Sequence, residues 1–401
     1  MLKARVLRNA VVVATAAVAL AACGNSSNNS SGGGLASGSS SNGGGSGSGQ
    51  TYKIGFQGAL SGDNQQLGIN EINSVKLAVK QANDKGDLPF KLAVLPSDDG
   101  GTPDKAPAAA AALIQDNQVM AVVGPIFSGP TKAVGTTYAQ AGMPLISPSA
   151  TNSALTSSGF STFHRIVPPD QVQGTDAADW MAKKAQNVYV VDDTSEYGKG
   201  LADDIQKELQ AKNIKTERQS VPASTQDYGA IAQAVTSSGA GAMYYAGYDA
   251  QAALFAKALQ SAGYKGIAMG GDGDKSTVFT QNAGSAGDGW YFTCPCLDAT
   301  VAPQAKAFTD AYQKMFNTPP STYSPEAYDA TNAIIQAIKD AQSKGNVTRQ
   351  TVEDAINNLD YKGITTTVKF KSNGEAEQQV INLYQQKNGK IELIGDISKQ
   401  S

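Results

Sequence analysis

The sequence predicts an α/β protein made of two Rossmann-like lobes, each built on a parallel sheet. Short apolar runs alternate with longer helical segments, which is the pattern of parallel sheets assembled from right-handed βαβ units. The alternation forms two series that are separated near "FHRIVPPD" at 163–170. The chain has 401 residues, of which 41% are hydrophobic and 17% charged. This length and composition are sufficient to bury the cores of two lobes.

The N-terminal segment predicts export and anchoring. Three basic residues precede the apolar run 10–22, which is too short to span a bilayer and is typical of a signal peptide over residues 1–22. The run ends in "LAAC", which resembles a bacterial lipobox and predicts a lipid on Cys23. The alternative is an ordinary secretory signal followed by an unrelated cysteine. In 24–50, 24 of 27 residues are Gly, Ser or Asn. We therefore expect 23–51 to be a flexible tether.

Net charge argues against a nucleic-acid partner. The whole chain carries −3, and the first 22 residues hold three basic residues and no acid, so the remainder carries −6. A nucleic-acid-binding surface would need a basic patch, and the sequence shows no Lys/Arg cluster after residue 10.

The first series of strands and helices follows the tether. "VMAVVGP" is apolar throughout and predicts a strand buried on both faces. Lys85 and Gly86 form a helix stop. We expect strands over 52–60, 90–99, 119–125 and 143–150, and helices over 70–85, 102–117 and 129–142.

The second series has the same form, with strands over 187–193, 242–248 and 266–272 and helices over 198–213 and 250–263. Two further helices are expected over 302–316 and 324–345, and a hairpin over 380–395 turns at "KNGK".

Polar residues follow the strands, where parallel sheets bind ligands. Ser128 precedes a helix, so its hydroxyl and the helix N–H groups are suited to hold a carboxylate, and Thr151 is suited to assist. The carbonyl of Ser149 and the acid Asp272 are suited to hold an ammonium group. Because none of these loop tips carries a basic side chain, the set favours a zwitterion such as an α-amino acid.

Each of these residues also has a structural interpretation. Ser128 is placed to act as a helix N-cap, Thr151 as a turn hydroxyl, and Asp272 as a solvated turn acid between glycines. Tyr197 and Tyr248, at two further strand ends, are also suited to packing at a rim.

Enzyme and metal functions find little support in the sequence. The chain has a single histidine, His164, and lacks the G-x-S-x-G and H-E-x-x-H patterns, so we expect neither an enzyme nor a bound metal or cofactor. Cys294 and Cys296 stand in "TCPC". They are interpreted either as two small buried side chains or as a disulfide, and a metal site would need two further soft ligands.

At this point the sequence resembles the leucine/isoleucine/valine-binding proteins, the type I periplasmic binding proteins of branched-chain amino-acid ABC importers. The resemblance covers most of residues 52–395. It is carried in order by "IGFQGALSG", "VVGPIFSG", "ISPSATNSALT", "SEYGKGLA", "YYAGYDAQ", "GGDG" and "SPEAYDA".

The resemblance implies a ligand site. The hydroxyls of Ser128 and Thr151 and the amide of Thr151 would bind the carboxylate, and the Ser149 carbonyl and Asp272 would bind the amino group. Tyr197 and Tyr248 would close over the ligand from the second lobe. The segment 149–151 contributes Ser149, Ala150 and Thr151 to the predicted set.

Two departures concern the ligand side chain. Leu67 stands where the family has an aromatic residue, and Phe127 stands where several members have a disulfide-bonded cysteine. Tyr323 is expected to line the same pocket. We expect a branched-chain or other aliphatic amino acid, with a small amide or urea as the alternative.

The resemblance also implies a domain plan and partners. Lobe 1 would comprise 52–166 plus 297–367 and lobe 2 would comprise 167–293 plus 368–401, joined by a hinge of three crossing strands. A lipid-anchored monomer would deliver its ligand to membrane permease subunits. A tethered ligand sensor is the alternative role for the same site.

Overall fold

The computed structural model describes residues 49–401. The predicted signal peptide 1–22, Cys23 and the tether as far as residue 48 lie outside the described residues. Within residues 49–401, no helix combines the length and apolar character needed to cross a membrane. The first strand begins at Thr51, one residue before the expected start of the first lobe.

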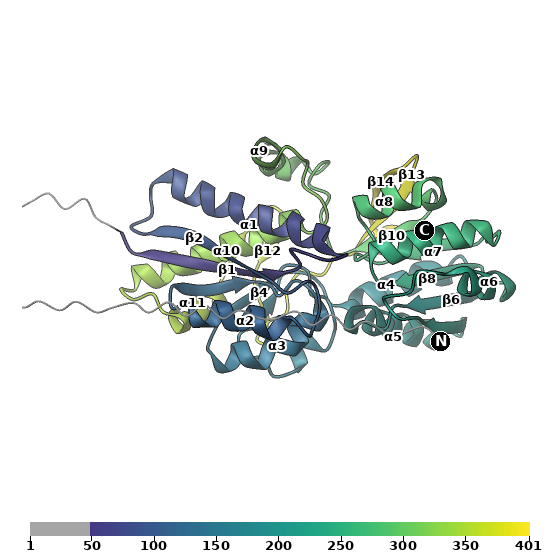
Figure 1. The fold of residues 1–401 in the computed structure, drawn as a ribbon, viewed down its shortest axis with the longest axis horizontal. Helices are drawn as coiled ribbons and strands as arrows, with labels where there is room; N and C mark the ends of the chain where they lie inside the picture. The colour runs from purple at the N-terminus through teal and green to yellow at the C-terminus, as the bar shows by residue number, and fades with distance from the viewer. Residues whose placement is uncertain (1–48) are drawn as a thin grey trace, which may run out of the picture. The chain divides into compact units, whose positions relative to one another are not determined.

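The first sheet is fully parallel, with strand order β2-β1-β3-β4-β5. Its strands are β1 (Thr51–Gly58), β2 (Lys91–Asp98), β3 (Val119–Val123), β4 (Leu145–Ser147) and β5 (Phe163–Arg165). The helices α1 (Gln65–Lys85), α2 (Ala106–Gln115), α3 (Ser128–Gln140), α10 (Ser324–Ser343) and α11 (Arg349–Asn357) pack against it or against one another (Figure 1). Every residue of β3 is buried, as its apolar sequence predicts.

The second sheet has the order β14-β13-β10-β9-β8-β6-β7. The strands β6 (Asn187–Asp192), β7 (Lys215–Ser220), β8 (Ala242–Ala246), β9 (Ile267–Gly270) and β10 (Tyr291–Cys294) are parallel. The hairpin β13 (Asn382–Lys387) and β14 (Lys390–Asp396) joins antiparallel to β10. The helices of this half are α4 (Asp170–Ala182), α5 (Glu196–Ala211), α6 (Gly229–Ser237), α7 (Asp249–Ser261) and α8 (Thr277–Ala283). The predicted α/β class with parallel sheets is confirmed.

The chain passes between the two halves after β5, after β10 and after the small sheet of β11 (Tyr361–Lys362) and β12 (Thr367–Val368) (Figure 1). The second passage leads to α9 (Lys306–Phe316) and then to α10. Short 3₁₀ helices lie at Leu155–Ser157, Gly284–Gly287, Pro303–Ala305 and Ile397–Lys399.

The pair Cys294 and Cys296 forms a disulfide with an S–S distance of 2.01 Å, and both side chains are buried. Of the alternatives that the sequence left open, the structure therefore contains the bridge, at the point where β10 ends and the chain crosses back.

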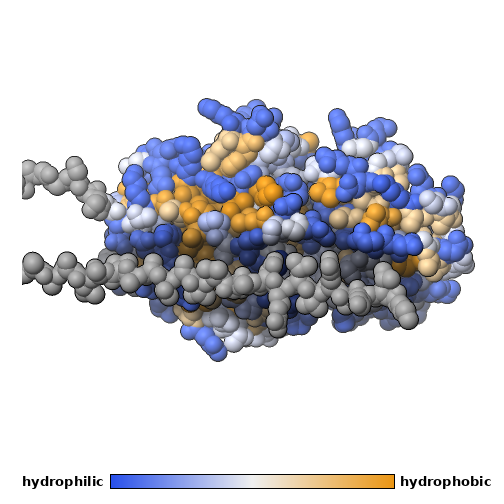
Figure 2. Space-filling view, in the orientation of Figure 1, coloured by the Kyte–Doolittle hydropathy of each residue, from blue (hydrophilic) through white to orange (hydrophobic). Residues whose placement is uncertain are grey.

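The surface is predominantly hydrophilic at its edges. Figure 2 shows hydrophobic residues gathered toward the middle of one face between hydrophilic margins. Large apolar side chains that reach solvent include Val301, which is 60% exposed, and Val380, which is 51% exposed. Most apolar side chains instead fill the cores beside the two sheets.

Candidate functional site

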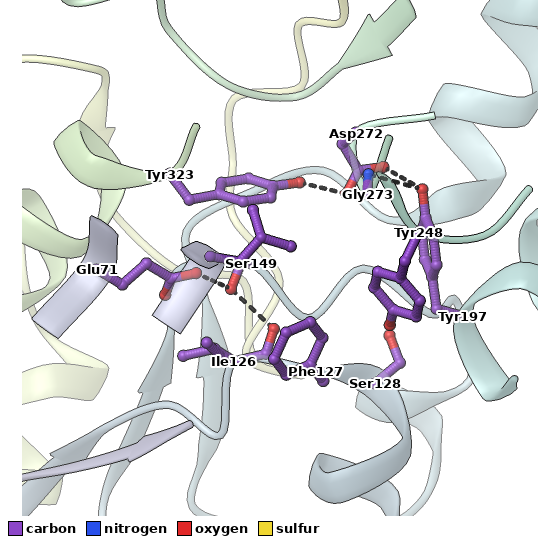
Figure 3. Close-up of a pocket in the computed structure, with 11 residues that line it drawn as sticks. Glu71, Ile126, Phe127, Ser128, Ser149, Tyr197, Tyr248, Asp272, Gly273 and Tyr323 are labelled. Atoms are coloured by element: carbon purple, nitrogen blue, oxygen red, sulfur yellow. Dashed lines mark hydrogen bonds between the residues drawn. The ribbon is translucent and has the colours of Figure 1, made fainter. Parts of the chain in front are cut away.

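Loops from both sheets converge on a cavity between the two halves. Its wall comes from the N-terminal part of α1, the loops after β3 and β4, the loops after β8 and β9, and the starts of α5 and α10. The lining residues are Leu67, Glu71, Ile126, Phe127, Ser128, Ser149, Tyr197, Tyr248, Asp272, Gly273 and Tyr323 (Figure 3). A cavity with a few polar groups in an apolar wall is the usual form of a small-molecule site.

Ser128 forms the donor end of the cavity. It is the first residue of α3 and only 2% exposed, and the cap position is taken by Phe127, whose side chain makes no cap bond. The Ser128 Oγ accepts a hydrogen bond from the main-chain N–H of Asn152 at 3.1 Å. Since a hydroxyl both donates and accepts, the Ser128 O–H is left to donate into the cavity. The free N–H groups at the start of α3 add a positive dipole end there.

Asp272 forms the acidic end. It follows β9, is 3% exposed, and accepts hydrogen bonds from the Tyr323 hydroxyl at 2.6 Å and the Tyr197 hydroxyl at 2.8 Å. The Gln173 Nε2 donates to the same carboxylate at 2.8 Å. Burial raises the pKa of Asp272 above its ordinary value, while these three bonds act in the opposite direction. A carboxylate has about four acceptor positions, so one remains for an ammonium group.

Two glycines permit the close approaches that form the cavity. A Cβ on Gly68 would lie 1.7 Å from the carbonyl oxygen of Ala59, so glycine lets α1 press against the loop after β1. A Cβ on Gly273 would lie 2.4 Å from the carbonyl oxygen of Gly247, so glycine lets the loop after β9 approach the loop after β8. The first contact fixes the part of α1 that carries Leu67, and the second fixes the loop that carries Asp272.

Aromatic rings connect the two halves across the cavity. The Phe127 ring, before α3, lies 5.4 Å from the Tyr248 ring, before α7, and the planes meet edge to face. Tyr248 in turn lies 5.3 Å from Tyr197, and burial raises the pKa of both tyrosines well above the ordinary value. The rings therefore remain neutral phenols with O–H groups that can donate.

Further contacts hold the halves together beside the cavity. The Lys132 Nζ of α3 lies 2.8 Å from the Glu196 Oε2 of α5, and the Asn152 Nδ2 donates to the Glu196 carbonyl at 2.7 Å. With the Tyr323–Asp272 bond, these contacts give a closed arrangement of the cleft.

The family model described as periplasmic binding protein matches residues 51–390. The chain belongs to the periplasmic binding protein family. Its relatives include the Leu/Ile/Val-binding protein BraC3 of Rhizobium johnstonii, 30% identical over 84% of this chain and 92% of that protein. A second is the leucine-, isoleucine-, valine-, threonine- and alanine-binding protein of Pseudomonas aeruginosa, 26% identical over 84% of this chain and 90% of that one.

Solved structures agree with the fold of this family member. The branched-chain amino-acid transporter substrate-binding protein LivJ of Streptococcus pneumoniae, solved with isoleucine, matches with a TM-score of 0.77 and 27% identity over 86% of this chain and 100% of that one. The leucine-binding protein LivK of Thermotoga maritima matches with a TM-score of 0.78 and 21% identity, over 87% of this chain and 99% of that one. The predicted family and its type I fold are confirmed.

In this periplasmic binding protein, most of the residues predicted for the site meet in the cavity. Eight of them line it: Leu67, Phe127, Ser128, Ser149, Tyr197, Tyr248, Asp272 and Tyr323. Asp272 is not the solvated loop acid of the alternative interpretation, and Ser128 is not an N-cap.

Ala150 and Thr151 are not among the lining residues. Arg165, which is fully buried, donates to the carbonyls of Ala150 at 3.2 Å and Asn152 at 2.8 Å. The Thr151 carbonyl accepts from the Asp170 N–H at 2.8 Å, and the Thr151 side chain is fully buried. This segment is thus hydrogen-bonded to Arg165 and to the start of α4.

Three lining residues were missed: Glu71, Ile126 and Gly273. Glu71 stands four residues after Leu67 on α1, so the helical repeat places both on one face and provided a signal for it. Ile126 and Gly273 are neighbours of predicted residues.

A buried cation near the cavity was also overlooked. Lys275 is 8% exposed and follows Asp272 by three residues, yet it does not line the cavity. Its Nζ lies 4.3 Å from the centroid of the Tyr384 ring and 3.4 Å from the Thr322 Oγ1, and burial lowers its pKa.

Two observations concern possible metal ligands and the single histidine of the chain. Within residues 49–401, no three His, Cys, Asp or Glu residues are grouped as metal ligands. His164 lies on β5 with its Nδ1 3.2 Å from the Leu145 carbonyl and is not among the cavity residues.

Proposed function

We propose that this protein is the extracytoplasmic solute-binding subunit of an ABC importer and that it captures an α-amino acid with an aliphatic side chain. One observation carries the proposal. A hydroxyl with a spare O–H, on Ser128, and a buried carboxylate, on Asp272, belong to the same enclosed cavity, whose remaining wall includes Leu67, Ile126 and Phe127. The relatives that bind leucine, isoleucine and valine support the same ligand class.

The ligand head would be neutralised at both ends. Its carboxylate accepts hydrogen bonds from the Ser128 O–H and the N–H groups at the start of α3, without any cation. Its ammonium meets Asp272 and the carbonyl of Ser149. Because an unpaired charge in a buried site is costly, a ligand that lacks either group leaves one end uncompensated and binds weakly. We further propose that the protein binds its ligand without enzymatic activity.

Closure follows from the two-sided contacts. Ser128 belongs to the proposed lobe 1 (52–166 plus 297–367), and Asp272 belongs to the proposed lobe 2 (167–293 plus 368–401). A ligand that contacts both lobes stabilises the closed form over the open one, and the closed form would dock on a membrane permease. We further propose that a lipid on Cys23 and the tether keep the monomer at the outer face of the cell membrane.

Isothermal titration calorimetry with the twenty amino acids, acetamide and urea tests the proposal. We expect tight binding of one or more of leucine, isoleucine and valine, and no heat from the corresponding amines or carboxylic acids, which lack half of the head. Tight binding of acetamide or urea with no amino acid bound would contradict the proposal.

A further inference from the structure

Glu71 is a second acid in the cavity wall, and the binding of a ligand head does not use it. It lies on α1, one helical turn after Leu67, and is 1% exposed. Figure 3 shows its carboxyl group turned toward Ser149, on the side of the cavity away from Tyr197 and Asp272.

The hydrogen-bond contacts of the Ser149 hydroxyl indicate the charge of Glu71. The Ser149 Oγ lies 2.9 Å from the Glu71 Oε1 and 2.8 Å from the carbonyl oxygen of Ile126. If Glu71 were ionised, both of these oxygens would only accept, and a serine hydroxyl has a single proton to donate. One of the two close contacts would then be a repulsion between lone pairs. A proton on Glu71 resolves the conflict, because Glu71 then donates to Ser149 and Ser149 donates to Ile126.

The other carboxyl oxygen supports the same conclusion. The Glu71 Oε2 is buried and makes no hydrogen bond within the described residues. An ionised carboxylate with one oxygen bare in a buried site would lose hydration without compensation, whereas the carbonyl oxygen of a neutral acid loses less.

The charged surroundings also act against ionisation. Burial raises the pKa of Glu71 well above its ordinary value, and the nearby Glu326 of α10 raises it again. A bond donated by Ser149 to Glu71 would lower this pKa, but the Ser149 proton is required by the Ile126 carbonyl. The other titratable groups that line the cavity are Asp272 and the tyrosines Tyr197, Tyr248 and Tyr323. None of them offers Glu71 a positive charge.

We propose that Glu71 is held as a neutral carboxylic acid whose proton is donated to Ser149, and that it acts as a specificity-determining residue for uncharged ligand side chains. The statement on specificity rests on the proposed amino-acid site, whereas the protonation state does not. With its proton engaged, Glu71 offers only the lone pairs of Oε2 to a neighbour. An anionic side chain therefore finds no donor there, and a neutral side chain meets no charge.

Glu71 also makes the affinity for the ligand dependent on pH. A group with a raised pKa in the closed form keeps its proton below that pKa, so affinity is unaffected there. As pH rises through the raised pKa, Glu71 ionises, the Glu71–Ser149–Ile126 chain loses its proton, and affinity for a neutral amino acid falls.

The substitution Glu71→Gln tests the protonation state, because an amide reproduces a neutral acid in shape and can donate to Ser149. We expect leucine to bind the variant within about threefold of the wild type near neutral pH, and the alkaline loss that belongs to Glu71 to disappear. Both proteins keep any loss that arises from the ligand amine, so their difference isolates Glu71. Glu392→Gln, on the exposed strand β14, is the matched control and should change neither property.

A measurement without ligand decides the matter independently of the proposed function. With ¹³C-labelled glutamate side chains, we expect the wild type near neutral pH to show a neutral-acid carboxyl resonance that is missing in E71Q. If E71Q does not fold, Ser149→Ala should shift the titration midpoint of that resonance to lower pH, because the neutral acid loses the acceptor of its proton, and a shift to higher pH would overturn the proposal. A Glu71 resonance at the position of an ionised carboxylate would overturn the proposal. A tenfold or greater loss of leucine affinity in folded E71Q would overturn it as well. Binding of no amino acid, with the neutral resonance present, would overturn the specificity and leave the protonation state standing.

Discussion

Replacing the acid of the ligand site by its amide is the sharpest perturbation of the proposed binding mode. Asp272 accepts bonds from three donors that are all neutral, from Tyr197, Tyr323 and Gln173. In Asp272→Asn, the amide oxygen can keep the bonds from Tyr197 and Gln173, and the amide NH₂ can donate to the Tyr323 oxygen, because a phenol also accepts. The local network survives, and the lost element is the negative charge that faces the ligand ammonium.

The expected loss of affinity follows from that difference. Truncating one partner of a buried, hydrogen-bonded charge pair costs about 2–5 kcal/mol, which is about 30-fold or more in Kd. The protein without ligand should melt at the same temperature or higher, because a buried charge with a raised pKa has been removed.

Calorimetry with leucine and thermal melts of the free protein measure the two effects. Asp310→Asn, which removes an exposed acid from α9, is the control and should bind leucine as the wild type does. Leucine affinity within about threefold of wild type in D272N would refute the charge pairing. A large drop in the melting temperature of the free variant would show that Asp272 serves the fold instead.

Three further predictions follow from the same geometry. Ser128→Ala removes one hydrogen bond to a charged carboxylate and should weaken leucine binding by about 10-fold to 100-fold, and an unchanged Kd would contradict its role. The melting temperature of the free protein should also fall by a few degrees, because the Asn152 N–H loses its acceptor. The affinity for leucine should fall as pH is lowered through the raised pKa of Asp272, because the ligand ammonium needs the ionised acid. A leucine affinity of the wild type that stays constant on the acid side would count against this role of Asp272. Gly68→Ala places a Cβ against the Ala59 carbonyl oxygen and should lower the free energy of unfolding by about 1–3 kcal/mol, measured by urea denaturation. A denaturation midpoint equal to that of the wild type would show that α1 can move away from Ala59.

Sequence patterns were informative where apolar burial follows a regular pattern along a helix or strand. The apolar run that becomes β3 and the alternation that becomes α5 and β8 reflect a core that excludes water, and both were predicted close to their observed bounds. The strand β7 was missed because it lies at the edge of its sheet with the polar sequence "KTERQS" and carries no apolar alternation. The helix α4 was missed because polar and small residues, Gln173 and Gly174 among them, contribute to its buried face.

The sequence predicted those site residues whose position follows from the end of a parallel strand. The rule that ligands bind at the carboxyl ends of parallel strands selected Ser128 and Asp272, and both line one cavity. The rule could not show that Arg165, held by Glu375 from 210 residues away, binds the carbonyls of Ala150 and Asn152 beside the cavity. Such long-range pairing leaves no local pattern in the sequence.

The small molecules that remain bound to the protein through purification test the central claim most directly. The protein should be purified from its native host without added ligand, denatured to release its contents, and the released compounds identified by mass spectrometry. Our account predicts a stoichiometric α-amino acid with an uncharged aliphatic side chain, and D272N should release much less of it. A stoichiometric compound without an amino group, retained equally by D272N, would contradict the account.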